Sequence, residues 1–115
     1  MNFFQRLMSQ FSPAHKMEQV YGRAIERAKR HDISGAVADY SIVVDEESTP
    51  LQLRAMALMN RAKAYSALKS HEKARADLIA VLELPKAPPA VKEAAREKLT
   101  RMMKYLKLHN PDAAT

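Results

Sequence analysis

The stretch from residue 58 to residue 84, LMNRAKAYSALKSHEKARADLIAVLEL, contains the pattern from which the fold can be predicted. Apolar or small side chains recur in it every three or four residues, first at Leu58, Ala62, Tyr65 and Leu68 and then at Ala74, Leu78, Val81 and Leu82. This spacing places them on one face of each of two α-helices. Ser70 lies between the two sets and is a good capping residue for the second helix. The stretch therefore predicts two helices that form a hairpin.

The pattern of this stretch also occurs 38 residues earlier in the chain. Four blocks match in one register: Arg23-Ala24 with Arg61-Ala62, 36–40 with 74–78, 43–45 with 81–83, and Thr49-Pro50 with Ala87-Pro88. A bias towards alanine and arginine can produce one such match, but not four in the same register. The chain therefore contains two copies of a helical hairpin. Asp39 and Asp77 occupy equivalent positions, which indicates a structural role for both.

Capping residues and prolines predict where the helices begin and end. Ser12 followed by Pro13 fits the start of a helix, because proline in the first turn has no intrahelical bond to lose. Thr49-Pro50 repeats this signal for the third helix, and either Asp32 or Ser34 caps the second. The expected helices cover about residues 13–30, 33–47, 50–69, 71–84 and 89–108, the last being stopped by His109-Asn110-Pro111.

These helices predict a single all-α domain made of antiparallel hairpins and a capping helix. Repeat one covers about residues 17–48, repeat two about 50–85 and the capping helix about 89–108, within a domain of residues 13–109. Residues 1–12 form an amphipathic N-terminal segment and residues 110–115 a tail. Small side chains recur at equivalent sites, where we expect the helices to cross closely: Ala24 with Ala62, and Ala36 with Ala74.

Composition narrows the class of protein further. Hydrophobic residues make up 47% of the chain and charged residues 28%, which is typical of a folded domain. The absence of cysteine excludes disulfides and thiolate metal sites and is compatible with a reducing cytoplasm, where we expect the protein to be. We expect no transmembrane span, because no apolar run approaches about 20 residues. Arg6 interrupts the apolar N-terminus, which therefore does not resemble a secretory signal.

The net charge of +6 is concentrated in the last helix. Residues 86 to 109 contain seven basic and two acidic side chains. Such a concentration of positive charge favours acidic partners.

The repeated pattern resembles the tetratricopeptide repeat over about residues 17–108. In the second unit the motif reads Leu58-x-x-Arg61-Ala62-x-x-Tyr65 in the first helix and Ala74-x-x-x-Leu78-x-x-Val81 in the second. In the first unit it reads Val20-x-x-Arg23-Ala24-x-x-Arg27 and then Ala36-x-x-x-Tyr40-x-x-Val43. The sequence departs from the family in having no tryptophan, arginine at positions 23 and 61 where leucine is usual, and valine at positions 43 and 81 where alanine is usual. Its period is also longer than the family's usual 34 or so residues.

The resemblance implies a short right-handed solenoid whose first helices line a concave, partly basic groove. It implies a non-catalytic adaptor or scaffold that holds a peptide or protein segment, with acidic groups suiting the basic end. One subfamily of these repeats binds the C-terminal carboxylate of heat-shock chaperones. This sequence does not fit that function, because Tyr21 and Ile25 stand where the subfamily has lysine and asparagine. The residues expected to line the groove are Glu18, Tyr21, Gly22, Ile25, Lys29, Met56, Met59, Asn60, Lys63, Ser66, Lys98, Arg101 and Lys104.

The residues also bear on three other classes of function. A short stack with an uncovered apolar end can pair with a second copy, giving a weak homodimer. The basic last helix, whose one aromatic residue is Tyr105, allows weak nucleic-acid binding, although acids are interleaved with its bases. Catalysis, cofactor binding and metal binding are not expected, because the chain has no nucleophile motif or phosphate-binding glycine loop. Its histidines, at positions 15, 31, 71 and 109, show no metal-ligand spacing.

The N-terminal segment contains every phenylalanine of the chain, at positions 3, 4 and 11, and adds Leu7 and Met8 at helical spacing. Three roles for it remain open. It can cover the exposed end of repeat one, dock on a partner or a membrane surface, or occupy the groove of the protein itself.

Overall fold

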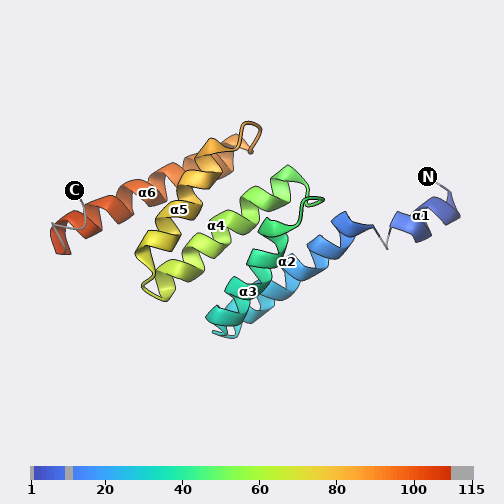
Figure 1. Ribbon diagram of the computed structural model, residues 1–115, viewed down its shortest axis with the longest axis horizontal. Coiled ribbons are helices and arrows are strands. Elements are labelled where there is room, and N and C mark those ends of the chain that lie inside the picture. Colours follow the sequence, from blue (N-terminus) through green and yellow to red (C-terminus); the bar gives the residue numbers. More distant parts are fainter. Residues whose placement is uncertain (1, 10–11, 110–115) are drawn as a thin grey trace.

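The computed structural model describes residues 2–9 and 12–109, and every regular element in this part of the chain is an α-helix. The helices are α1 (Phe3–Ser9), α2 (Pro13–Lys29), α3 (Ile33–Asp45), α4 (Leu51–Ala67), α5 (His71–Glu83) and α6 (Pro89–His109). From α2 onward each helix packs against the next one in the chain (Figure 1). The α2–α3 and α4–α5 hairpins are therefore stacked in sequence order with α6 after them, which confirms the predicted all-α fold of stacked hairpins.

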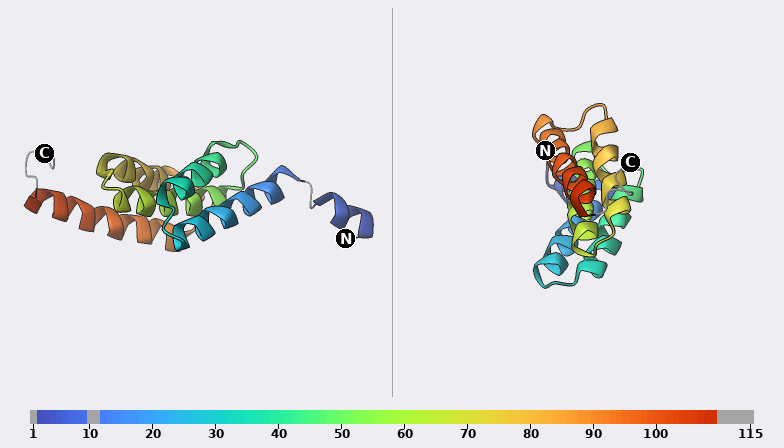
Figure 2. Two further views of the ribbon diagram at one scale, coloured as in Figure 1. Left: turned by 90° about the horizontal axis from the view of Figure 1, so that it is seen from below. Right: turned by 90° about the vertical axis from the view of Figure 1, so that its left-hand side faces the viewer.

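The first helix of each hairpin lies on one side of the molecule and the second helix on the other. The left view of Figure 2 shows α2 and α6 along the lower edge and α3 and α5 along the upper edge, with α4 set back between α2 and α6. The α4 helix contacts both α2 and α6. We call the side formed by α2, α4 and α6 the concave face.

Most helix ends lie within two residues of the expected positions, and local chemistry explains them. The Ser12 hydroxyl accepts a hydrogen bond from the His15 amide at 3.1 Å, as expected of the first cap. Asp32, not Ser34, caps the second helix, because its carboxylate accepts from the Gly35 amide at 3.1 Å. His31 and Lys69, which are repeat equivalents, both take positive φ angles, of 65° and 60°, in the turn after α2 and α4.

The prediction that Thr49 caps the third helix is wrong. The Thr49 hydroxyl is buried and donates to the Val43 carbonyl at 2.7 Å, so it satisfies the end of α3 and not the start of α4. The α4 helix consequently begins at Leu51, after Pro50. Ser70 does occupy the cap position of α5, but its side chain makes no capping hydrogen bond.

The core consists of two clusters, one formed by the first hairpin together with Ala57 of α4 and the other by the second hairpin together with Ala95 and Met102 of α6, and Val44 packs against both. Ala24, Ala36, Ala62 and Ala74 are all completely buried. A larger side chain at these positions would push apart helices that touch through their smallest side chains. The structure therefore agrees with the prediction that small residues recur where helices cross.

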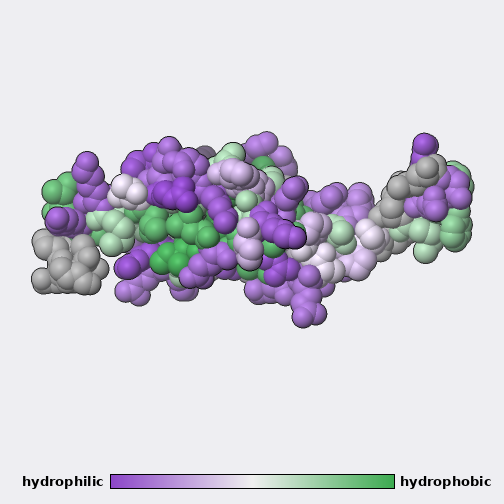
Figure 3. Space-filling model, turned by 90° about the horizontal axis from the view of Figure 1, so that it is seen from above, coloured by the Kyte–Doolittle hydropathy of each residue, from purple (hydrophilic) through white to green (hydrophobic). Residues whose placement is uncertain are grey.

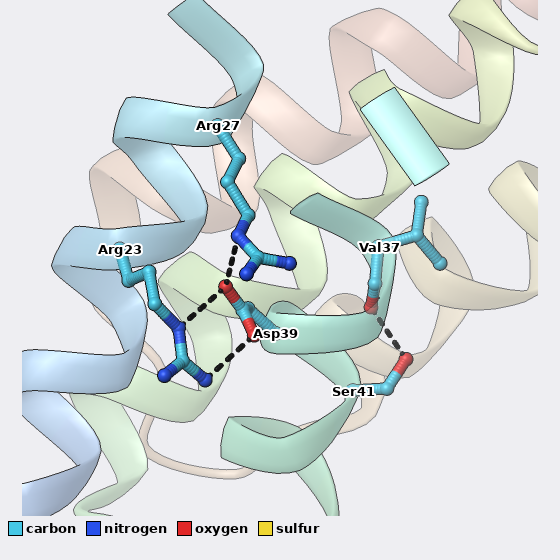
Figure 4. A network of polar contacts seen from close by, with 5 residues as sticks. All are labelled: Arg23, Arg27, Val37, Asp39 and Ser41. Carbon is cyan, nitrogen blue, oxygen red and sulfur yellow. Dashed lines mark hydrogen bonds and ion pairs between the residues drawn. The ribbon is translucent and has the colours of Figure 1, made fainter. Parts of the chain in front are cut away.

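Each hairpin also contains a buried aspartate that an arginine of its first helix holds in place. Arg23 donates to both carboxylate oxygens of Asp39 at 2.9 Å, and Arg27 lies 3.4 Å from the same carboxylate (Figure 4). In the second hairpin Arg61 donates to both oxygens of Asp77 at 2.7 and 2.8 Å. Two parallel bonds to one carboxylate fix the distance and the rotation of the paired helices. The two arginines therefore have a structural role at the positions where the sequence departs from the tetratricopeptide pattern.

One arginine also connects the two hairpins. Arg61 donates to the hydroxyl of Ser41 at 3.0 Å, and Ser41 in turn donates to the Val37 carbonyl of α3 at 2.8 Å. The same guanidinium lies 5.6 Å from the centre of the Tyr65 ring, within the range of a cation–π interaction. Arg61 thus contributes both to the closure of the second hairpin and to its stacking on the first.

The α1 helix stands apart from the stacked helices. Its apolar side chains are exposed, with Phe3 81% and Phe4 65% accessible to solvent. It extends beyond α2 at one end of the molecule (Figures 1 and 2), and Figure 3 shows hydrophobic residues on its surface. The structure therefore differs from the two expectations that this segment covers repeat one or fills the groove. Phe11, which was grouped with α1 on helical spacing, lies outside the described residues.

Removal of residues 1–9 is therefore expected to leave the stability of the stacked helices unchanged. The side chains of α1 bury too little apolar surface to contribute, so the free energy of unfolding should change by less than about 0.5 kcal/mol. Urea unfolding followed by circular dichroism measures it. A loss of more than about 1 kcal/mol would show that α1 packs on the domain in solution.

Among residues 2–9 and 12–109, no helix combines the length and the apolar character that a bilayer crossing requires.

Candidate functional site

A hollow of about 280 Å³ opens on the concave face where α2, α4 and α6 meet. We call it the central hollow. Its walls are mainly apolar, with the polar groups of Asn60 and Lys63 at one side. Its lining residues are Tyr21 from α2, Met56, Met59, Asn60 and Lys63 from α4, and Ala90, Val91 and Ala94 from α6. A hollow with large, adaptable side chains on one wall and small ones on the other accepts a protruding apolar side chain.

Tyr21 and Asn60 form the polar corner of the central hollow. The Asn60 side-chain amide donates to the Tyr21 hydroxyl at 2.6 Å and so connects α4 with α2. Partial burial raises the pKa of Tyr21, and the hydrogen bond from Asn60 opposes that rise. The Tyr21 ring also lies 5.9 Å from the ring of Tyr40 in the core of the first hairpin. One hydrogen bond and one ring contact therefore hold this corner in place.

A second hollow, of about 270 Å³, lies further along the same face, towards the end of α6. We call it the terminal hollow. It collects side chains that can donate hydrogen bonds, together with an aromatic ring and a thioether. Its lining residues are Ser66 from α4, His71 from α5, and Lys98, Arg101, Met102 and Tyr105 from α6.

Three cations lie close to one another on the concave face. Burial lowers the pKa of the Lys98 ammonium, and the positive charges of Lys63 and Arg101 lower it further. None of these three side chains forms a salt bridge with an acidic residue in the described chain. Like charges that lie together without acids raise the local positive potential, and an anion placed among them would be stabilised. We call Lys63, Lys98 and Arg101 the cationic cluster.

Most of the residues expected in the groove do come together. Five of them line the central hollow, and Ser66, Lys98 and Arg101 line the terminal one. Met56 is 40% exposed and available for contact, whereas Met59 is 8% exposed and belongs mainly to the core. Asn60 and Lys63 also line a smaller hollow of about 200 Å³ next to Tyr40.

The remaining expected groove residues lie elsewhere. Ile25 is half-buried and packs against the core of the first hairpin. Lys29 is exposed and lies 3.4 Å from Glu26. Glu18 is also exposed, as are Gly22 and Lys104, and none of these five residues lines the central hollow, the terminal hollow or the smaller hollow next to Tyr40. Ile25 differs from the expectation because its side chain turns towards the core, and the other four differ because they lie on rows of α2 and α6 that face solvent.

Two contributions were not predicted from the sequence, that of α6 to the central hollow and that of α5 to the terminal one. Val91, Ala94, Lys98, Arg101 and Tyr105 follow one another at intervals of three or four residues. This row runs beside the core-facing row of α6 and is a second helical stripe, so the spacing alone contained the signal. The sequence gives no indication that His71 lines the terminal hollow. Its ring lies 6.0 Å from that of Tyr105, and this contact depends on how α5 packs on α6.

Among the described residues, no group of three or more His, Asp or Glu side chains is placed to hold a metal ion. Comparison of the chain with protein-family models, with curated proteins and with solved structures gave no match.

Proposed function

We propose that this protein is a non-catalytic protein-interaction module of the tetratricopeptide kind, an adaptor or scaffold whose concave face holds a peptide segment with acidic and apolar side chains. The single observation that carries the proposal is the central hollow, whose apolar walls lie beside a cationic cluster that has no acidic partner. Two helical hairpins packed in sequence order, with a single helix after them, support the family assignment.

The energetics of such binding divide between the two parts of the face. Burial of one large apolar side chain in the central hollow contributes about 1.5–3 kcal/mol. The cationic cluster adds attraction at a distance, which raises the association rate and selects acidic partners. Because the chain carries a net charge of +6, a neutral or basic segment of the same shape gains no such attraction.

The distance between the two hollows determines how long the bound peptide segment must be. Both are lined by α4, the central one around Met59 and the terminal one at Ser66. At 1.5 Å per helical residue, this places the hollow centres about 10–15 Å apart. An extended peptide covers that distance in about four residues. We therefore expect a short extended segment with an apolar side chain in the central hollow and an acidic side chain about four residues away, at the terminal hollow.

Nucleic-acid binding is less well supported as the alternative, because the basic residues of α6 do not share one face. Lys98 and Arg101 line the concave face, while Arg96 is paired with Glu93 at 2.6 Å. Lys104 lines none of the hollows. A phosphate backbone is bound most strongly by cations arranged along one surface.

A displayed library of random twelve-residue peptides tests the proposal. Wild-type protein is expected to enrich peptides that combine aspartate or glutamate with large apolar residues. The variant Met56→Glu, Lys63→Glu should bind the enriched peptides at least about tenfold more weakly, because it places carboxylates in the hollow and removes one cation. Fluorescence polarisation of a labelled peptide measures the affinity.

The matched control is Ile42→Glu, Lys86→Glu, which makes the same chemical changes at exposed sites on α3 and in the loop before α6. It should bind like the wild type. Equal loss in both double variants would mean that net charge alone governs binding. Enrichment of basic or purely polar peptides by the wild type would contradict the proposal.

A further inference from the structure

The hydroxyl of Ser66 is buried and has no hydrogen-bond partner among the described residues. A serine inside a helix usually donates to the carbonyl four residues earlier. Ser41 does so to Val37 at 2.8 Å, and Thr100 does so to Arg96 at 2.9 Å. Ser66 does not. An unmade hydrogen bond at a buried hydroxyl is costly, so its presence in the wall of a hollow suggests that a ligand completes it.

The other walls of the terminal hollow define what such a ligand must be. Lys98 and Arg101 line the hollow and donate without accepting, and Lys63 lies near enough to Lys98 to lower its pKa. The ligand must therefore supply acceptor atoms to several donors at once. A carboxylate carries one negative charge, whereas a phosphate monoester carries about −1.5 to −2 and three acceptor oxygens. Three cations that form no salt bridge with an acid of the described chain match the phosphate better than the carboxylate.

An aromatic surface lies beside these donors. Tyr105 is 50% exposed, its ring is stacked on that of His109 at 4.1 Å between centres, and the ring of His71 lies 6.0 Å away. Met102 adds a thioether, which makes favourable contacts with aromatic rings. A volume of about 270 Å³ fits a single ring with its substituent but not a nucleotide-sized cofactor.

We propose that the terminal hollow is a binding site for an aromatic phosphate, with the phosphate held by Ser66, Lys98 and Arg101 and the ring against Tyr105 and Met102. In a bound peptide this group is the side chain of a phosphorylated tyrosine. The inference rests on the proposed function and deepens it, since it names the anionic group of the segment on the concave face. Ser66 reaches the phosphate once the long side chains lining the hollow shift, and its hydroxyl hydrogen then has an acceptor.

The arginine of this site remains available in spite of a nearby acid. Arg101 also lines a shallow hollow with Glu97, four residues before it in α6. No salt bridge joins these two side chains. An exposed pair at this spacing contributes only about 0.3–0.5 kcal/mol, so it does not compete with a doubly charged ligand.

Titration with phenyl phosphate, followed by proton–nitrogen NMR, tests the site without any peptide. The amides of Ser66, Lys98 and Tyr105 are expected to shift and to saturate. Phenyl phosphate should bind at least about tenfold more tightly than benzoate, because it carries more charge and more acceptors. It should also bind more tightly than inorganic phosphate, because only the ester has a ring. Absence of saturable shifts at these amides, or equal affinity for benzoate, would overturn the proposal.

The variant Ser66→Ala separates binding from folding. The hydroxyl has no partner within the described protein, so its removal should not lower stability, and alanine favours the helix. Affinity for phenyl phosphate should fall about tenfold, the usual effect of losing one hydrogen bond to a charged group. Thr100→Ala removes an exposed hydroxyl elsewhere on α6 and is expected to bind like the wild type. Unchanged binding by Ser66→Ala would overturn the role of the hydroxyl.

Two peptides distinguish this inference from the proposed function. One has the sequence favoured in the library selection, and the other is the same peptide with a phosphotyrosine in place of its acidic residue. Tighter binding of the phosphopeptide, lost in Ser66→Ala, supports the inference. Binding of the first peptide without any preference for the second overturns the phosphate site and leaves the proposed function standing. If phenyl phosphate binds but neither peptide does, the site is kept as one for free aromatic phosphates and the proposed function fails.

Discussion

Replacement of Arg61 by methionine is expected to lower the free energy of unfolding by about 3 kcal/mol. Asp77 is almost fully buried, with a side chain 7% exposed, and Arg61 supplies the hydrogen bonds to both of its oxygens. Methionine keeps much of the apolar stem but leaves a buried carboxylate without a charge partner. It also removes the bond to Ser41 that joins the two hairpins. Urea unfolding followed by circular dichroism measures the loss.

The repeat-equivalent Arg23→Met is the control, and its effect should be clearly smaller. Asp39 keeps a second arginine, because Arg27 lies 3.4 Å from its carboxylate. Arg23 is also far more exposed than Arg61, with 54% of its side chain accessible against 15%. The double variant Arg61→Met, Asp77→Leu should regain most of the lost stability, because it leaves no buried charge behind. Equal effects of the two arginine substitutions would contradict this account.

Enlargement of Ala62 to leucine is expected to destabilise the protein by about 2–3 kcal/mol. Ala62 is completely buried in the core of the second hairpin, beside Ala74 and Leu78. The added atoms have no space, so α4 and α5 must move apart and the bidentate bond of Arg61 to Asp77 must lengthen. The loss should therefore appear both in the midpoint of thermal unfolding and in the free energy obtained from urea.

Thr100 occupies the equivalent position in α6, 38 residues after Ala62, and it is exposed. Thr100→Leu should change stability by less than about 0.5 kcal/mol, because no helix of the described chain packs over it. The contrast between the two substitutions tests whether α6 ends the stack as a capping helix. Strong destabilisation by Thr100→Leu would show that α6 is covered in solution, for example by a second copy.

The stacked hairpins could be predicted from the sequence because apolar spacing and a 38-residue repeat both depend only on local pattern. The structural role of Arg23 and Arg61 could not be predicted in this way. Arg23 and Asp39 recur together as Arg61 and Asp77, yet only the crossing of two helices shows that each pair makes two hydrogen bonds. Thr49 was misassigned because a hydroxyl before a proline suits the end of one helix as well as the start of the next.

Part of the candidate site could also be predicted, because helical spacing depends only on local pattern. The α4 residues Met56, Asn60 and Lys63 lie on one face by helical spacing alone, and the structure brings them together. Ile25 was misplaced because one turn of α2 contributes both to the core and to the surface, and spacing does not show where the boundary lies. The unpartnered hydroxyl of Ser66 is invisible in the sequence, since it depends on where a hydrogen bond is not made.

The central claim is that the concave face, formed by α2, α4 and α6, is the surface on which a ligand binds. Proton–nitrogen NMR of the protein titrated with the peptide most enriched by the library tests it most directly. The predicted result is a set of saturable shifts at Tyr21, Met56, Asn60, Lys63 and Ala94, with the exposed positions of α3 and α5 unchanged. Shifts confined to α3, α5 or α1 at saturation would contradict it.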